Sequence, residues 1–346
     1  MNKLVAVTVG CGHAAQHRHI PTFLRQRGSV RVSAVCDLNF ALAKDTAGKF
    51  GIQKSYSSLA EMLSKEEPDI VDVCVPPEAH EKTAIEAMEG GSHVLIEKPM
   101  ALSVEGCEEM IRVARTNGVK LSVVHNQRFY PPFLRAIELV QKGAIGEVLG
   151  ARLCFLSREE EYMNKEHHWV HKLPGGVLGE TGPHTVYLSL PFAKTIRDAE
   201  VTASKTLGYP WVDFDTFSAN LVGDSLIQIF ISHASKYTAE EVEIFGTQGK
   251  IWMDLQSMLL NVQTRRYATP LSLAASSLTT STRIVEGVLS NAISSIMGRS
   301  LLGHDPLVKG FIESIRQDTA PPVPPEEGLE TTRVMELMIT KLRSAS

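Results

Sequence analysis

The start of the chain constrains its fold more than any other stretch. An apolar run at residues 4–9 leads into Gly10-Cys11-Gly12-His13-Ala14-Ala15, and a helical pattern follows over 16–27. Gly10 permits a tight turn, Gly12 lets a phosphate approach the backbone, and the small Ala15 lets the helix pack close to the strand. This order of strand, glycine turn and helix predicts a dinucleotide site, which we assign to Gly10, Gly12, His13 and Ala14.

The second strand ends on an acid at the spacing that such a site requires. Residues 31–36 read as a strand, Asp37 follows it, and residues 38–40 bring no arginine. A carboxylate there accepts hydrogen bonds from the adenosine ribose, whereas an arginine would favour a 2′-phosphate. NAD is therefore favoured over NADP. An Asp37 that only caps the next helix is the alternative interpretation.

Strand and helix patterns alternate as far as residue 125. Apolar strands at 70–75, 94–96 and 120–124 are separated by helical patterns at 78–90 and 104–117. This alternation predicts a right-handed, doubly wound parallel sheet. We expect a Rossmann dinucleotide-binding domain over residues 1–125.

The strand at 94–96 ends on Glu97-Lys98-Pro99. Such a strand is buried on both faces, so its charged residues emerge at the carboxyl end, where open α/β sheets bind ligands. Pro99 disfavours a helical backbone at Lys98, so the amine is presented from an extended position. Lys98 is therefore a candidate catalytic residue, and a salt-bridged strand end is the plain alternative.

Two prolines close the preceding strand. The run at 70–75 stops at Pro76-Pro77, and His80 lies in the first turn of the helix that follows. Because consecutive prolines delay that helix, the backbone there can lie along a flat ligand. We place the following residues in the cofactor site beside Lys98: Pro76, Pro77, His80, Glu97 and Asn126.

From residue 147 onward the pattern changes to successive strands. Candidate strands lie at 148–156, 199–207, 214–222, 225–233, 239–245, 250–255 and 259–264. They predict an α+β domain over 126–320, a mostly antiparallel open sheet covered by helices on one face. Residues 321–346 read as a proline-rich linker and a closing helix, which we expect to pack back on the Rossmann domain.

One helix of the second half carries a polar stripe. It begins near Gly175; Glu180 and His184 are four residues apart, and Tyr187 follows three later, so all three lie on about the same face. Such a stripe on an otherwise apolar helix is typical of a site, whereas a lone histidine is more often a core residue. We expect Glu180 and Tyr187 to orient a substrate and His184 to be the acid or base.

An insertion at 268–303 carries a second amphipathic helix. Its apolar residues recur at helical spacing, at positions 284, 285, 288, 289, 292, 293, 296 and 297. We expect a lid or subunit-contact helix. Contact with a membrane surface through 282–299 is disfavoured, because only two arginines, Arg283 and Arg299, flank the helix closely.

Together these motifs resemble those of one oxidoreductase family. They are G-x-G-x-x-A at 10–15, Asp37, V-P-P at 75–77, E-K-P at 97–99 and N-x-R-F at 126–129. Their order and spacing resemble the glucose-fructose oxidoreductase, inositol dehydrogenase and rhizopine catabolism (GFO/IDH/MocA) family. The resemblance implies an NAD(P)-dependent oxidoreductase with Arg128 and Trp169 near the substrate. It also implies a homo-dimer or homo-tetramer formed through the open sheet face.

The chain departs from that family's pattern at the second site. Pro174-Gly175-Gly176 stands where the family has three glycines, Glu180 replaces an aspartate, Tyr187 takes the last polar position, and Val170 replaces an arginine after Trp169. A longer carboxylate at Glu180 would move substrate hydroxyls by about a bond length. We keep the reaction type that the resemblance implies, but the sugar or polyol used by members of that family cannot be assigned to this chain.

The composition narrows the possible partners and functions of the protein further. The 346 residues carry a net charge of −4, which gives no reason to expect nucleic acid as a partner. Five scattered cysteines and no secretion-type start predict a reduced, cytoplasmic protein without disulfides or a metal site. Two rivals stay open. One is a non-catalytic, redox-responsive dinucleotide-binding protein, and the other is a same-fold reductase of a non-sugar substrate such as a dihydrodiol or tetrapyrrole.

The favoured function is reversible hydride transfer between nicotinamide and a secondary hydroxyl of a sugar, nucleotide sugar or polyol. The hydride leaves only as the hydroxyl proton is lost, so the site needs a base and a group that stabilises the alkoxide. The free pKa of histidine, about 6.5, suits His184 as the base. Lysine has a free pKa of about 10.4, so Lys98 is expected to stay an ammonium that hydrogen-bonds the oxygen. The family resemblance also admits Lys98 as the proton carrier.

Overall fold

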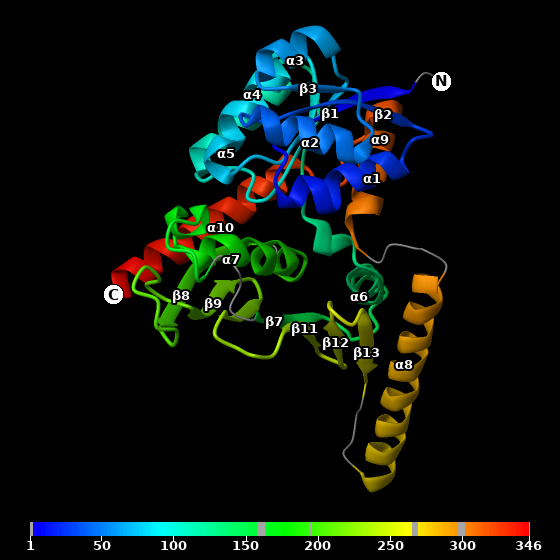
Figure 1. Ribbon diagram of the computed structural model, residues 1–346. Helices are drawn as coiled ribbons and strands as arrows, with labels where there is room; N and C mark the ends of the chain where they lie inside the picture. Colours follow the sequence, from blue (N-terminus) through cyan, green and yellow to red (C-terminus); the bar gives the residue numbers. More distant parts are fainter. Residues whose placement is uncertain (1–2, 158–162, 194, 265–268, 297–301, 346) are drawn as a thin grey trace. The chain divides into compact units, whose positions relative to one another are not determined.

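The computed structural model describes residues 3–157, 163–193, 195–264, 269–296 and 302–345, and Figure 1 labels its elements. The chain divides into two compact units. Unit 1 comprises residues 1–126 and 304–333, and unit 2 comprises residues 127–303 and 334–346.

Unit 1 is built on a six-stranded sheet. Its strands are β1 (Leu4–Val9), β2 (Val30–Cys36), β3 (Lys54–Tyr56), β4 (Ile70–Val73), β5 (His93–Ile96) and β6 (Leu121–Val123). They lie in the order β3-β2-β1-β4-β5-β6, and every neighbouring pair is parallel. The predicted doubly wound parallel sheet is confirmed. Its strands are short and apolar because both faces are buried; Val71, Leu95 and Val123 are inaccessible to solvent.

Helices connect these strands. They are η1 (Ala15–His19), α1 (Ile20–Arg25), α2 (Phe40–Phe50), α3 (Leu59–Glu66), η2 (Pro77–Ala79), α4 (His80–Glu89) and α5 (Val104–Thr116). Their starts follow from local chemistry: the Ser58 and Ser103 side chains accept hydrogen bonds from backbone N–H groups three residues later. The first of them, η1, is a π-helix, so the helical pattern at 16–27 contains a wider turn before α1.

Residues 304–333 belong to unit 1, although the sequence analysis assigned 304–320 to the second domain. They form α9 (His304–Gln317) and the first part of α10 (Pro325–Ala345). Arg25 on α1 pairs with Asp305 at 2.7 Å, and the Ser122 hydroxyl donates to the Val323 carbonyl at 2.9 Å. These tertiary contacts, which periodicity does not encode, place the segment against the parallel sheet.

Unit 2 is built on a seven-stranded sheet. Its strands are β7 (Val148–Leu156), β8 (Ile196–Ser204), β9 (Thr216–Gly223), β10 (Leu226–Ser232), β11 (Ala239–Gly246), β12 (Lys250–Asp254) and β13 (Leu259–Gln263). The order is β13-β12-β11-β7-β10-β9-β8, and all pairs are antiparallel except β7 with β10. The predicted mostly antiparallel open sheet is confirmed.

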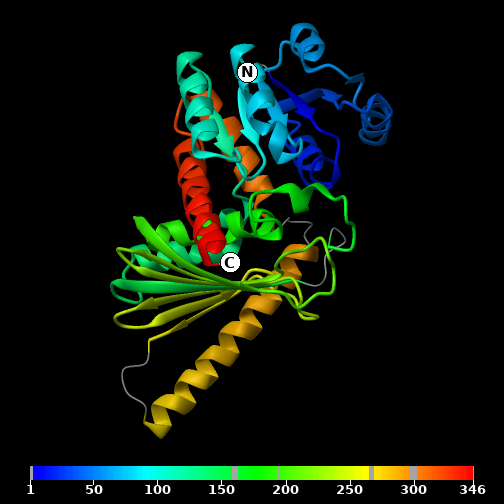
Figure 2. The ribbon, with the colours of Figure 1, turned by 90° about the vertical axis from the view of Figure 1, so that its left-hand side faces the viewer.

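Helices lie on both faces of this sheet. In Figure 2 the sheet is seen nearly edge-on, with α7 (Val177–Ser189) on one side and α8 (Pro270–Ile296) on the other. The α7 side holds the apolar core, which includes Leu153, Ile229 and Val242. The unit is completed by α6 (Pro131–Gln141), the short turns η3 (Asn126–Phe129), η4 (Trp169–Lys172) and η5 (Leu190–Phe192), and the end of α10.

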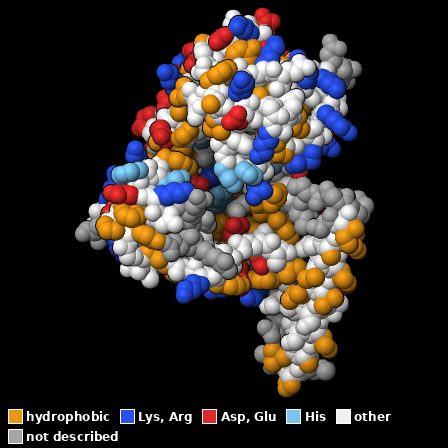
Figure 3. Space-filling view, viewed as in Figure 1, with side chains coloured by type: hydrophobic (Ala, Val, Ile, Leu, Met, Phe, Trp, Pro, Cys, Tyr) orange, Lys and Arg blue, Asp and Glu red, His pale blue; other side chains and the backbone are white. Residues whose placement is uncertain are grey.

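The inserted helix α8 packs on the edge strand β13 through small and polar groups. Asn291 donates to the carbonyls of Ser257 and Met258, and Asn261 donates to the hydroxyl of Thr280. The apolar side chains Val285, Val288, Leu289 and Ile293 are 53–58% exposed, and Figure 3 shows apolar side chains along this helix. Residues 268 and 297–301 of the predicted insertion, with position 297 of its apolar stripe, lie outside the described residues.

Candidate functional site

The glycine turn lies at the carboxyl end of β1. Gly10 has a φ of +91°, and a Cβ atom there would lie 2.5 Å from the Cys74 carbonyl oxygen. At Gly12 a Cβ atom would meet nothing within 4 Å, so the space beside that backbone is open. Gly10 is therefore needed for the turn, and Gly12 offers the approach that a phosphate requires. His13 is exposed and stacks on His17, and Ala14 is half-buried.

Asp37 follows β2 and is tied to the glycine turn. Its Oδ2 accepts a hydrogen bond from the Cys11 backbone N–H at 2.8 Å, and its Oδ1 accepts one from the Asn39 N–H at 2.8 Å. The side chain is half-buried. The carboxylate is thus fixed beside the turn, in the position from which it could also accept from a ribose hydroxyl.

Lys98 lies directly beyond β5, at the same edge of the sheet, and its backbone is held on both sides. The Lys98 N–H donates to Glu97 Oε2 at 2.9 Å, and the Glu97 N–H donates to the Val73 carbonyl at 3.0 Å. On the other side, His80 Nδ1 lies 2.7 Å from the Pro99 carbonyl. Lys98, a half-buried residue, is therefore presented from a backbone with little freedom.

The residues after β4 have different exposures. Pro76 is exposed and Pro77 is buried. His80 is 1% exposed, and its second ring nitrogen lies 2.9 Å from the Val75 carbonyl. Burial lowers the pKa of His80. His80 thus lies between the Val75 and Pro99 carbonyls at this edge, and its place in the cofactor site stays a prediction.

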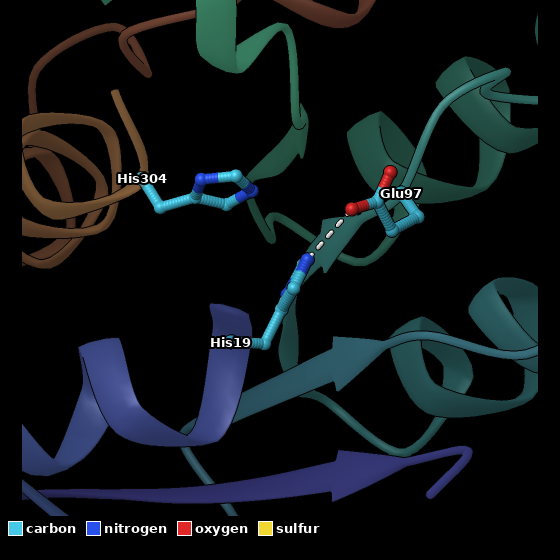
Figure 4. A group of neighbouring side chains, drawn as sticks. All are labelled: His19, Glu97 and His304. Carbon is cyan, nitrogen blue, oxygen red and sulfur yellow. Dashed lines mark hydrogen bonds and ion pairs between the residues drawn. The ribbon is translucent and has the colours of Figure 1, made fainter. Parts of the chain in front are cut away.

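Glu97, the neighbour of Lys98, belongs to a cluster of buried and half-buried ionisable side chains. His19 Nδ1 is 2.7 Å from Asp72 Oδ1, and His19 Nε2 is 2.8 Å from Glu97 Oε1. Figure 4 shows the His19 ring reaching Glu97, with His304 nearby. The ring centroids of His19 and His304 are 5.6 Å apart. Burial lowers the pKa of His304 to about 4, helped by the nearby His19.

Sequence reasoning missed this cluster. Asp72 is an acid inside the apolar strand β4 and is inaccessible to solvent. Because buried carboxylates almost always have a partner, such an acid is a signal for one. The partner, His19, follows the glycine turn by seven residues, and nothing local in the sequence indicates that its ring turns toward β4.

In unit 2, the helix α7 exposes a narrow stripe. Along α7, all of which the structure describes, Glu180, Thr181 and His184 are half-buried and the other residues are buried. Tyr187 is inaccessible to solvent, and its hydroxyl lies 2.7 Å from His184 Nδ1. The structure therefore joins Tyr187 to the His184 ring from beneath, instead of presenting it on the stripe beside Glu180.

The remaining predicted substrate residues lie on turns of unit 2. Arg128, in η3, is half-buried, and burial lowers the pKa of its guanidinium. Its neighbour Gln127 donates its backbone N–H to the Tyr187 hydroxyl at 3.4 Å. Trp169 begins η4, and its ring centroid lies 5.4 Å from that of His168. The predicted cofactor residue Asn126, half-buried, is the first residue of η3 and the last residue of this segment of unit 1.

A glycine turn with open space beside it, a carboxylate fixed after the second strand and a lysine at the same edge of a parallel sheet define the class. These are the parts of a nucleotide-dependent oxidoreductase. Two family models match the chain. One, described as an oxidoreductase family with an NAD-binding Rossmann fold, matches residues 4–125, and the GFO/IDH/MocA C-terminal domain matches residues 133–252. The protein belongs to the GFO/IDH/MocA family, as its motifs predicted.

Curated relatives cover part of the chain. The D-glucoside 3-dehydrogenase of Escherichia coli is 29% identical over 199 residues, 55% of this chain and 55% of that protein. The levoglucosan dehydrogenase of Pseudarthrobacter phenanthrenivorans is 26% identical over 182 residues, 51% of this chain and 47% of that protein. The chain thus spans about half the length of these relatives.

Solved structures share the fold along the whole chain. The WlbA dehydrogenase from Bordetella pertussis, in complex with NADH and UDP-GlcNAcA, has a TM-score of 0.84 at 19% identity. The match covers 100% of this chain and 97% of that one. In the part of the chain that the structure describes, no helix has the length and apolarity needed to cross a membrane.

Proposed function

We propose that this oxidoreductase transfers a hydride between NAD and a secondary hydroxyl or carbonyl of a sugar, nucleotide sugar or polyol. The observation that carries the proposal is the fixed presentation of Lys98 at the edge of the sheet that also holds the Gly10–Gly12 turn and Asp37. The names of the relatives support the substrate class, because they are dehydrogenases of glucosides and of levoglucosan.

In this proposal two residues act on the reacting oxygen. Lys98 donates a hydrogen bond from its ammonium and stabilises the developing alkoxide. His184 takes the hydroxyl proton at Nε2 while its Nδ1–H donates to the Tyr187 oxygen. When bound, the nicotinamide accepts or returns the hydride. The two residues come from different units, and their meeting at one oxygen is part of the proposal.

The neighbouring residues have supporting roles. Glu180, half-buried four residues before His184, would accept hydrogen bonds from substrate hydroxyls. Arg128 and Trp169 would contact the ring or its charged substituent. Tyr187 is proposed to orient His184 instead of touching substrate, because its hydroxyl is buried and already meets His184 Nδ1.

Asp37 supports NAD over NADP in this proposal. Its carboxylate is held beside the turn, where a 2′-phosphate would meet a negative charge. All five cysteines are free. Because disulfides are rare in reducing compartments, we also propose a cytoplasmic protein.

An oligomer is also part of the proposal. Apolar side chains are 41–86% exposed on α8 and on the face of the sheet opposite α7. They are Val285, Val288, Leu289, Ile293 and Ile296 on α8, and Leu226 and Phe230 on β10. Burial of such groups against a second copy would remove them from water. We therefore favour subunit contact for this face over contact with a membrane surface.

The experiment is a screen of sugars, sugar acids, polyols and nucleotide sugars for NAD reduction by the purified protein, repeated with Lys98→Ala and His184→Ala. Each variant is expected to lose at least about a hundredfold in turnover and to keep its NADH affinity. Lys82→Ala, on α4, is the matched control and should keep full activity. NADH binding without turnover of any compound would favour a non-catalytic dinucleotide-binding protein.

A further inference from the structure

A chain of hydrogen bonds within unit 1 connects the centre of the sheet to the backbone of Lys98. Asp72 Oδ1 on β4 meets His19 Nδ1, His19 Nε2 meets Glu97 Oε1, and Glu97 Oε2 accepts from the Lys98 N–H. Asp72 is also held by the Thr8 hydroxyl, which donates to Oδ2 at 3.0 Å. Three elements, β4, η1 and the end of β5, therefore converge at one imidazole.

The geometry fixes the charge of that imidazole. An ionised carboxylate only accepts hydrogen bonds, so both ring nitrogens of His19 must donate, and the ring is an imidazolium. Burial alone would lower the pKa of His19, but the charge and hydrogen bond of Asp72, together with the contributions of Cys74, outweigh burial and raise it well above its ordinary value. Burial alone would raise the pKa of Glu97, but the hydrogen bond and charge of His19, with the charges of Lys98 and His304, together outweigh burial and lower it.

The local backbone gives His19 this position. His19 is the last residue of the π-helix η1 and the residue that precedes α1. A π-turn adds one residue to a helix and rotates the side chains beyond it, and such turns are frequent at functional sites. The ring is 1% exposed, so its positive charge is removed from water, and this cost in free energy is offset by the two carboxylates on either side of it.

We propose that His19 is a positioning residue for the reaction: it holds the Glu97 carboxylate so that this carboxylate fixes the backbone, and thereby the amine, of Lys98. The inference rests on the proposed role of Lys98. Glu97 has one oxygen on each side of the linkage, so a change at His19 reaches Lys98 through a single carboxylate. A misplacement of about 1 Å at a reacting group costs about a hundredfold in rate.

The inference predicts a new pH dependence when His19 is removed. Without the imidazolium, the effect of burial on Glu97 is opposed only by the charges of Lys98 and His304, so the pKa of this carboxyl rises and it takes up a proton at a higher pH than in wild type. The titratable groups that face the pair are Asp72, Cys74, His80, Lys98 and His304. Burial lowers the pKa of His80, raises that of the Cys74 thiol and lowers that of His304 to about 4, so Cys74 and His304 stay neutral from about pH 6 to 9.

The first experiment needs no substrate. In ¹⁵N-labelled full-length protein, both ring N–H groups of His19 are expected to stay protonated from about pH 6 to 9 and to vanish in His19→Gln. In lysine-methylated protein, the ¹³C resonance that disappears in Lys98→Arg should shift in His19→Gln. His93→Gln, at the opposite end of β5, is the matched control and should leave that resonance unmoved. A His19 ring that titrates like an exposed histidine, or that loses its protons to stoichiometric Zn²⁺, would overturn the inference.

The second experiment uses the substrate that the screen identifies. His19→Gln should lower kcat by at least about tenfold, leave NADH affinity within about twofold, and give kcat a new acid limb that wild type lacks. Because His19 acts through Glu97, the double variant His19→Gln/Glu97→Gln should be no slower than Glu97→Gln alone. If the two losses of kcat multiply in the double variant, or if the pH profile of His19→Gln matches that of wild type, His19 has only a structural role.

Failure of the inference and failure of the proposed function give different results. If no compound is oxidised, the function fails, and the spectra still decide whether His19 fixes Lys98. If Lys98→Ala is inactive while His19→Gln keeps full turnover and an unmoved Lys98 resonance, the function stands and the inference is wrong.

Discussion

The hydroxyl of Tyr187 lies 2.7 Å from Nδ1 of His184, three residues earlier on the same helix. Tyr187 is inaccessible to solvent and His184 is half-buried. A ring anchored at Nδ1 presents Nε2 in one direction. This arrangement has the form of a base with its orienting partner.

Removal of that hydroxyl tests the anchoring. Tyr187→Phe keeps the buried ring but leaves His184 Nδ1 without this partner, so kcat should fall by about tenfold while substrate KM changes little. Tyr130→Phe, a change at another buried tyrosine of unit 2, is the matched control. Unchanged kcat in Tyr187→Phe would restrict Tyr187 to packing.

The two glycines of the turn should respond differently to alanine. Gly10→Ala places a Cβ atom 2.5 Å from a backbone oxygen at a φ of +91°, so it should lower the free energy of unfolding by about 2 kcal/mol or more. Gly12→Ala meets nothing within 4 Å and should leave stability within about 0.5 kcal/mol.

Gly12→Ala should nevertheless weaken NADH binding by at least about tenfold, because its methyl group occupies the approach to the backbone. Thermal melting and NADH fluorescence titration measure the two effects. Normal NADH affinity in a folded Gly12→Ala variant would contradict the assignment of this turn to the pyrophosphate.

Asp37 should decide between the two dinucleotides. Wild type is expected to bind NADH more tightly than NADPH, and Asp37→Ser should reduce that preference by at least about tenfold, because the charge that repels a 2′-phosphate is lost. Asp45→Ser removes an exposed carboxylate on α2 and serves as the control. Equal affinity of wild type for both cofactors would refute this role.

His233 should make unit 2 sensitive to acid. It is 1% exposed, contacts the Ser157 and Thr181 hydroxyls, and burial lowers its pKa to about 4. Since the free pKa is about 6.5, the unfolded chain binds the extra proton first, so stability is present above pH 6.5 and is lost as the pH falls toward 4.

The melting temperature of wild type should therefore fall between pH 7 and 4.5, and His233→Gln should reduce that fall. His17→Gln, a change at an exposed histidine, should leave it as in wild type. An equal fall in wild type and His233→Gln would mean that other groups cause the acid sensitivity; His304, whose pKa burial also lowers to about 4, would be the next group to test.

The exposed stripe of α8 should be needed for assembly. Leu289→Asp places a charge among apolar groups, and we expect it to shift the protein to a smaller species in sedimentation velocity. Ser290→Asp adds the same charge at the next exposed position and should leave the mass unchanged. A monomeric wild type would refute subunit contact by α8.

Part of the site could be predicted from the sequence because it depends only on which residues directly follow each strand. Parallel strands bring their carboxyl ends to one edge, so any residue that follows such a strand is placed by its position alone. This holds for the Gly10 turn, for Asp37 and for Lys98. The same reasoning put Glu180 and His184 on one stripe of α7, where both are half-buried.

The amino-acid sequence by itself determined the two sheets and the elements that carry the motifs, because hydrophobic periodicity and glycine turns act over a few residues. Only the tertiary structure decided that Tyr187 lies beneath His184, that 304–333 belongs with the parallel sheet, and that His19 lies between Asp72 and Glu97. These relationships join residues from different elements or depend on which side of a helix is buried. Packing of the whole unit sets them, and no local pattern records it.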